Sequence, residues 1–172
     1  MKKLPLESLE SPVELTIKTS DGEFRARYTA DGLARLNFPD DVKEKNVTPK
    51  VPATVRTWHR LTEQAVKATL SGRPVKEWPP LDWTGTTEFQ QTVWRELLKI
   101  PCGQTKSYGE IAQAIGKPKA VRAVGTACGA NPVPVLVPCH RVLAASGKLG
   151  GFSGGLDRKR LLLTAEGVTP TE

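Results

Sequence analysis

The chain has 172 residues, enough to bury a core in one domain or in two small ones, and a formal net charge of +7. Its three cysteines form no CxxC pair and only two histidines accompany them, which argues against a disulfide framework and against a zinc site. No stretch approaches about 18 apolar residues and the first residues lead into no apolar signal segment, so we expect a cytoplasmic protein with no membrane contact and no metal.

Basic side chains are in excess mainly in the second half of the chain. Residues 83–172 hold 11 basic and 6 acidic side chains, whereas residues 1–82 hold 14 and 12. A polyanionic partner would therefore meet the second half. A charge of this size is also compatible with a surface that is merely solubilising.

Residues 13–38 alternate between apolar and polar side chains and contain Asp-Gly pairs at 21–22 and 31–32. Alternation with a period of two predicts strands, and Asp-Gly is a strong hairpin signal. We therefore expect a small antiparallel meander with one packed face. The charged stretch 39–52 has no periodicity and is expected to be a loop.

The next segment carries an apolar stripe at helical spacing. It predicts a helix that is capped by Thr54 and ends near Leu70, before a glycine and a proline. His59 lies on this helix, where we expect a surface or core residue rather than a metal ligand. Residues 73–85 are rich in proline and glycine and are expected to be a linker.

The second half of the chain has the pattern of several short helices. Apolar residues at intervals of four and three predict a helix over 86–100. The capping-box sequence Ser-x-x-Glu at 107–110 predicts a helix that closes at Gly116, and a further helix is expected over 119–128. Two short helices joined by a tight turn are a candidate helix-turn-helix, although any helical hairpin shows this pattern.

The second helix of this pair has an unusual composition. Beside Arg122 it carries mainly small side chains, including Ala123, Gly125 and Thr126. Helices that read the major groove usually display long polar side chains. This helix is better suited to close approach to a narrow surface such as the minor groove, although a buried core helix would fit equally well.

The apolar run 134–143 predicts a buried strand or extended segment that delivers Cys139 and His140. A thiolate is a strong nucleophile and a nearby imidazole can favour it, which suggests a reactive Cys139 assisted by His140. Free cysteine is among the most commonly buried residue types, so the dipeptide alone favours an inert structural thiol.

Longer motifs surround the Cys-His pair. They are NPVP at 131–134, PCHRV at 138–142 and GGFSGG at 150–155. Together with the helix-turn-helix segment and the closing LLLTAEG, they closely resemble the O6-alkylguanine-DNA alkyltransferases. The resemblance runs without a gap from about residue 86 to 168, and the N-terminal half is similar to the family only in layout.

We therefore expect an α+β protein in two parts. Residues 1–80 would form an α+β domain, RNase H-like in layout, with a small antiparallel sheet and a helix. Residues 86–170 would form a mostly helical DNA-binding and alkyl-acceptor domain that contains the helix-turn-helix. The charged run 158–160 is expected to be a solvated helix end, and Cys102 and Cys128 are expected to be structural.

The resemblance implies a role for each matching residue of the catalytic centre. Cys139 would accept the alkyl group, and His140 would take the thiol proton through a water. Glu166 would orient and charge that imidazole, in the manner of a nucleophile, base and orienting group. Asn131 would pin the turn that precedes the active-site segment.

The resemblance also implies a set of residues that contact DNA and the damaged base. Tyr108 would contact the guanine ring and the adjoining phosphate, and Arg122 would fill the space that the extruded nucleotide leaves in the duplex. Val142 and Ser153 would line the guanine pocket. The expected DNA- and base-binding set is Tyr108, Arg122, Ala123, Gly125, Thr126, Val142 and Ser153.

The implied function is direct, irreversible and stoichiometric transfer of an alkyl group from O6-alkylguanine, and also from O4-alkylthymine, to Cys139. The expected partner is double-stranded DNA bound through its minor groove, the protein would act as a monomer, and no cofactor would be needed. Two alternatives remain open at this point: a DNA-binding regulator with an inert Cys139, and a thiol hydrolase that uses Cys139 and His140.

Overall fold

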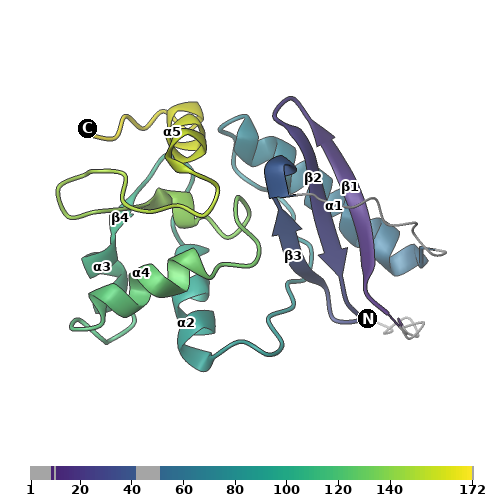
Figure 1. Ribbon diagram of the computed structural model, residues 1–172, viewed down its shortest axis with the longest axis horizontal. Coiled ribbons are helices and arrows are strands. Elements are labelled where there is room, and N and C mark those ends of the chain that lie inside the picture. The colour runs from purple at the N-terminus through teal and green to yellow at the C-terminus, as the bar shows by residue number, and fades with distance from the viewer. Residues whose placement is uncertain (1–8, 10, 42–50, 172) are drawn as a thin grey trace.

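A computed structural model describes residues 9, 11–41 and 51–171 of the protein. Its N-terminal half contains an antiparallel sheet in the order β1 (Val13–Thr19), β2 (Gly22–Tyr28) and β3 (Leu33–Asn37) (Figure 1). Val13 pairs with Tyr28 and Ala26 pairs with Leu36, so alternate apolar residues share one face. The predicted meander is confirmed.

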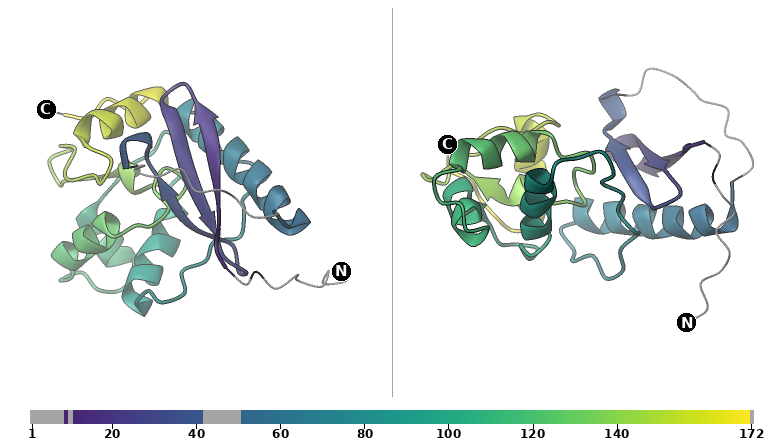
Figure 2. Two further views of the ribbon diagram at one scale, coloured as in Figure 1. Left: turned by 45° about the vertical axis from the view of Figure 1, so that its right-hand side comes forward. Right: turned by 90° about the horizontal axis from the view of Figure 1, so that it is seen from below.

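Helix α1 (Ala53–Leu70) covers the apolar face of this sheet, as the right-hand view of Figure 2 shows. The predicted cap at Thr54 is wrong. Pro52 occupies the N-cap position without a side-chain hydrogen bond, because the proline ring has no acceptor atom for the free N–H groups of the first turn. His59 is half-buried, and its Nδ1 lies 3.0 Å from the Tyr28 hydroxyl.

The two predicted connections differ from simple loops. In the stretch 39–52, Pro39–Asp41 form a short 3₁₀ turn, and residues 42–50 lie outside the described part of the chain. In the stretch 73–85, Leu33 of β3 donates its N–H to the Pro80 carbonyl at 2.8 Å and accepts from the Asp82 N–H at 3.0 Å. The second connection is therefore fastened to the edge of the sheet.

The C-terminal half has the three predicted short helices, α2 (Glu88–Leu97), α3 (Tyr108–Ala114) and α4 (Val121–Gly129), followed by α5 (Leu156–Ala165). The predicted capping box forms at Ser107 with Glu110, and a further one forms at Thr87 with Gln90. Helix α2 ends three residues earlier than expected and α4 begins two residues later. Helices α3 and α4 pack together as the expected helix-turn-helix.

The predicted strand in the run 134–143 is wrong over most of its length. Residues 132–137 form bends and turns and Cys139–Arg141 form a short 3₁₀ helix. A strand begins only at β5 (Val142–Leu143), which pairs in parallel with β4 (Lys106–Ser107). The prolines of the run remove N–H donors that a strand needs. Val135 has a φ of +74°, so the chain reverses here while its side chains stay buried.

The two halves share one continuous core. A single cluster of buried side chains includes Val13 and Phe24 from the sheet and Val137 and Leu162 from the C-terminal half. Leu36 of β3 also donates its N–H to the Pro132 carbonyl, in the turn before Cys139, at 2.9 Å. The division into residues 1–80 and 86–170 stays a prediction. Among the described residues, no helix is both long and apolar enough to cross a membrane.

Candidate active site

The turn before Cys139 is held by the side chain of Asn131. Its Oδ1 accepts the Val133 N–H at 3.0 Å, while its Nδ2 donates to the Val137 carbonyl at 2.8 Å and to Cys139 Sγ at 3.2 Å. Asn131 is itself buried, so these bonds satisfy an amide that would otherwise be costly to bury. Asn131 therefore both closes the turn and contacts the sulfur.

His140 and Glu166 form a buried pair directly beyond the sulfur. His140 is fully buried and its Nε2 lies 3.0 Å from Oε1 of Glu166, the residue that caps the C-terminus of α5. The other ring nitrogen, Nδ1, is buried and has no hydrogen-bond partner among the described residues. The neutral imidazole with its proton on Nε2 can therefore use Nδ1 as an acceptor.

Arg141 is a third member of this cluster that the sequence interpretation did not single out. Its guanidinium donates to both oxygens of Glu166, at distances of 2.8 to 3.2 Å, and its Nη1 donates to the Ile100 carbonyl at 2.7 Å. With the bond from His140 and the three from Arg141, the Gly103 N–H adds a fifth hydrogen bond to Glu166, at 3.2 Å. The carboxylate is thus fully coordinated, which fixes the imidazole it holds.

The charges of this cluster shift the ionisation of its members. Burial alone would raise the pKa of Glu166, but hydrogen bonds and the charges of His140 and Arg141 outweigh it and hold that pKa at about 2. Burial lowers the pKa of His140 against the opposing effect of Glu166, and Arg141 lowers it further. The resting imidazole is therefore neutral and can accept a proton.

Cys139 is buried, and burial raises its pKa, so the resting side chain is a thiol. Two side-chain groups lower this pKa, the amide of Asn131 and the positive charge of Lys159, and hydrogen bonds from the backbone of Cys139 and His140 lower it as well. All of these favour the thiolate once a base removes the proton. The site is therefore arranged to stabilise the sulfur anion at the moment it forms.

Lys159 contradicts the expectation that the charged run 158–160 is a solvated helix end. Its side chain is fully buried, and Nζ donates to the Val142 carbonyl at 2.6 Å and to the Gly151 carbonyl at 3.3 Å. Burial lowers the pKa of Lys159 to about 8, although Cys139 and Cys128 oppose this shift. Helix α5 has turned this lysine inward because backbone carbonyls can satisfy its ammonium group.

A pocket of about 670 Å³ opens onto Cys139. Its walls come from the N-terminus of α3, from one face of α4 and from the glycine-rich segment 150–155. The residues that line it are Tyr108, Val121, Arg122, Gly125, Thr126, Cys128, Gly129, Cys139, Gly151, Phe152 and Ser153. Six of the residues expected from the sequence therefore meet around one cavity: Tyr108, Arg122, Gly125, Thr126, Cys139 and Ser153.

The remaining expected residues lie close to this pocket without lining it. Ala123 is exposed on the outer surface of α4, and Val142 is fully buried with its carbonyl bonded to Lys159.

Of the residues that do line the pocket, Arg122 is exposed on α4, free to meet a partner. Burial raises the pKa of Tyr108 to about 12, so its hydroxyl stays protonated and can donate a hydrogen bond.

The two other cysteines differ from each other. Cys102 is half-buried, and its thiol lies 3.3 Å from the Gly72 carbonyl. Cys128 is buried and lines the pocket beside Cys139, which places it nearer to the chemistry than its structural role suggested. Burial raises the pKa of Cys128 to about 12, so this side chain also rests as a thiol.

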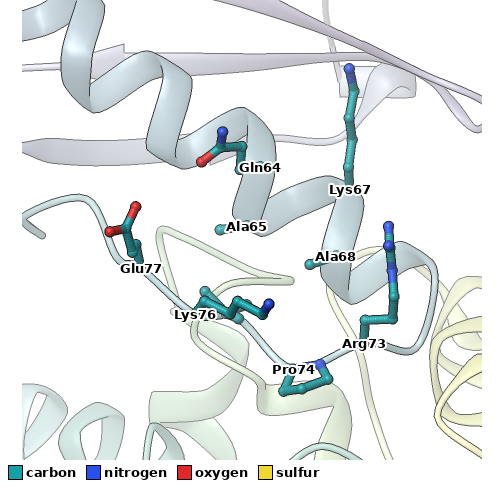
Figure 3. Close-up of a pocket in the computed structure, with 9 residues that line it drawn as sticks. Gln64, Ala65, Lys67, Ala68, Arg73, Pro74, Lys76 and Glu77 are labelled. Atoms are coloured by element: carbon teal, nitrogen blue, oxygen red, sulfur yellow. The ribbon is translucent and has the colours of Figure 1, made fainter.

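Another depression, of about 710 Å³, lies far from this chemistry between α1 and the segment 73–77 (Figure 3). Its walls combine small residues such as Ala65 and Ala68 with the charged side chains of Lys67, Arg73 and Lys76. The residues that line it include no thiol and no imidazole. It is larger than the pocket at Cys139, but none of the site residues expected from the sequence lines it.

Comparison with known proteins places this geometry in context. Residues 88–168 match the family profile described as "6-O-methylguanine DNA methyltransferase, DNA binding domain". A methylated-DNA–protein-cysteine methyltransferase from Mycobacterium tuberculosis is 62% identical over 86 residues, which are 50% of this chain. Those residues are 52% of that relative, so the chain spans about half the length of the mycobacterial proteins it matches.

Longer similarities cover most of the chain. A methylated-DNA–protein-cysteine methyltransferase from Methanosarcina mazei is 58% identical over 135 residues, covering 78% of this chain and 84% of that protein. The crystal structure of Mycobacterium tuberculosis OGT in complex with DNA superposes with a TM-score of 0.71 at 41% identity, covering 88% of this chain and 90% of that one. The chain therefore belongs to the methylated-DNA–protein-cysteine methyltransferase family.

Proposed function

We propose that the protein repairs DNA by moving an alkyl group from O6 of guanine to the sulfur of Cys139. The observation that carries this proposal is the position of Cys139. Its sulfur lies at a pocket between the helix-turn-helix and a glycine-rich segment, bonded to Asn131, with the His140–Glu166 pair next in the chain. Membership of the family supports the same reaction.

In the proposed reaction, neutral His140 takes the thiol proton through a water, using the nitrogen that has no protein partner. The sulfur attacks the alkyl carbon, the S–C bond forms, and the bond between that carbon and O6 breaks. The departing guanine takes up a proton, so no net charge is created. The Tyr108 hydroxyl and the Ser153 backbone can donate hydrogen bonds to the base as it leaves.

The product explains why such a protein would act once. A thioether has no acyl carbon that water can attack, so no step regenerates the thiol. One molecule should therefore remove one lesion. No cofactor is needed, because the nucleophile, the base and the hydrogen-bond donors are all side chains or backbone groups of this chain.

We further propose that the partner is double-stranded DNA, bound through its minor groove by α4. The small side chains Ala123, Gly125 and Thr126 allow close approach, and exposed Arg122 can enter the space of an extruded nucleotide. Extrusion is required because the target atom is inaccessible in a stacked duplex. On this proposal the protein acts as a monomer in the cytoplasm, with residues 86–170 carrying DNA binding and chemistry and residues 1–80 supporting them.

Incubation with O6-benzylguanine, followed by intact mass and peptide mapping, tests this function. We expect one benzyl group per molecule, on Cys139, and none in Cys139→Ala. Cys128→Ala is the matched control, because it removes the neighbouring thiol of the same pocket and should still be labelled. No adduct together with DNA binding would point to a regulator, and repeated turnover of an ester would point to a thiol hydrolase.

A further inference from the structure

Phe152 forms part of the wall of the pocket at Cys139, and its ring also packs against His140, the proposed base. Its ring lies edge-on to His140 with the centroids 6.5 Å apart. Phe152 stands in a segment with glycines at 150, 151, 154 and 155, whose backbone has little stiffness of its own. Something outside this segment must therefore hold the ring in place.

The support behind Phe152 is an aromatic side chain from the N-terminal half. Phe38, which follows β3, packs against Phe152 with ring centroids 5.8 Å apart and an interplanar angle of 67°. Phe38 is buried and stands in turn against Phe24 of β2, again at 5.8 Å. A continuous row of rings thus runs from the core of the sheet to His140.

Two further contacts fix Phe38 against the glycine-rich segment. The guanidinium of Arg158 lies over the Phe38 ring at 4.6 Å and donates to the Gly154 carbonyl at 3.0 Å and to Asp40 at 2.8 Å. Gly154 itself has no room for a side chain, because a Cβ there would lie 2.6 Å from the Phe38 ring and 2.9 Å from Phe152.

From this packing we infer that Phe38 is a positioning residue that sets the Phe152 wall of the pocket, so that the N-terminal half controls how bulky alkyl groups are held. The inference rests on the proposed function, because it concerns the same reaction. A large planar group such as benzyl must lie against that wall while the sulfur attacks. A methyl group reaches the sulfur without touching it.

Four variants test this role, with transfer from O6-benzylguanine and from a duplex that contains O6-methylguanine measured separately. In Phe38→Leu, benzyl transfer should slow by roughly tenfold, the order expected when a binding surface is displaced, and methyl transfer should change by no more than about twofold. Tyr28→Leu is the matched control. It removes a buried ring from the same sheet, at a site that packs against His59 and not in the row of rings, so it should lower the unfolding temperature similarly but leave the ratio of the two rates unchanged.

A compensating pair makes the test independent of stability. Gly154→Ala alone should slow benzyl transfer, because its Cβ displaces the rings. In the Phe38→Leu background the same change should be tolerated, since φ of Gly154 lies outside the left-handed region and the smaller leucine leaves space. The double variant should therefore be faster than the product of the two single effects.

The possible results separate the two proposals. If the wild-type protein takes up neither group on Cys139, the proposed function fails and this inference fails with it. If the wild-type protein reacts but Tyr28→Leu and Phe38→Leu change the benzyl-to-methyl ratio equally, Phe38 is only a core residue and the inference is overturned. Additive effects of Phe38→Leu and Gly154→Ala would overturn it as well.

Discussion

Two regions adjoin the pocket at Cys139: the buried relay, formed by His140, Arg141 and Glu166, and the exposed face of α4. They differ in burial and in hydrogen bonding. His140, Arg141 and Glu166 are nearly or fully buried, and hydrogen bonds fix every one of them. Arg122 and Thr126 on α4 are exposed, and Thr126 bonds only within its own helix. The difference shows that the protein holds its chemistry rigid and leaves its proposed DNA contacts free to adapt.

This contrast also separates two kinds of expected mutational effect. A change in the relay should alter the reaction of Cys139 with any alkyl donor and should cost stability, because it leaves a buried charge without its partner. A change on the exposed face should cost little stability and should matter only when the alkyl group lies in DNA. The predictions below test that separation, from the largest expected effect to the smallest.

Glu166→Gln should slow alkylation of Cys139 by roughly 10²-fold or more with O6-benzylguanine, the range typical of lost general acid–base assistance. The neutral amide would hold the imidazole less strongly as it takes up the thiol proton. Arg141 would also lose its counter-ion, and unfolding should become easier by about 3 kcal/mol. Rates from intact mass and denaturant unfolding check both parts.

The matched control for that variant is Glu63→Gln, the same chemical change on the exposed side of α1. It should leave the rate and the stability nearly unchanged. A Glu166→Gln protein that reacts at the wild-type rate would remove the carboxylate from the mechanism.

Arg122→Ala should slow repair of a lesion in duplex DNA by about tenfold while leaving the reaction with free O6-benzylguanine within about twofold of wild type. This arginine is proposed to act only when the lesion lies in duplex DNA, where its side chain would occupy the space of the extruded nucleotide. Arg60→Ala, an exposed arginine on α1, serves as the control for lost charge. Equal losses on both substrates would remove the proposed role of Arg122.

DNA affinity should fall as salt rises, because phosphate contacts release condensed counterions. In Arg122→Ala the logarithmic slope should become shallower by about one if this arginine contacts a phosphate. Fluorescence anisotropy with a labelled duplex measures both. An affinity that is independent of salt would argue against an electrostatic interface on α4.

The folded protein should lose stability in acid, as the carboxylate of Glu166 becomes protonated. The pKa of Glu166 is about 2 in the folded protein against an ordinary value of 4.5, so its contribution is fully present above pH 4.5 and is lost as the pH falls toward 2. Across this window the wild-type protein should lose stability more steeply than Glu166→Gln. Parallel slopes for the two proteins would mean that the carboxylate is not held in its charged form.

Local features of the fold could be predicted from the sequence because neighbouring residues determine them. The capping box at Ser107 and the meander with its Asp-Gly turns are confirmed. The run that delivers Cys139 was misjudged because its apolar residues fit a buried strand and a buried turn equally well. The side-chain bonds of Asn131 to residues two, six and eight positions later select the turn.

Long-range partners could not be predicted in the same way. Arg141 stands in the PCHRV motif, yet its contact with Glu166 joins residues 25 positions apart. Lys159 lies in a run of three basic residues, and only the docking of α5 shows that Lys159 is fully buried, that Arg158 packs over Phe38 and that Arg160 stays exposed. Phe38 sits in the half of the chain with the weakest family resemblance, and its position behind Phe152 depends on how the two halves pack.

The central claim is that the Cys139 sulfur takes an alkyl group from a base in DNA and keeps it. The most direct measurement uses a duplex with a single O6-methylguanine whose methyl group is isotopically labelled, followed by peptide mapping of the protein. The account predicts one labelled methyl per protein molecule, on the peptide that contains Cys139, and an unmodified guanine in the DNA. Label on another residue, or label released to solvent over repeated cycles, would contradict it.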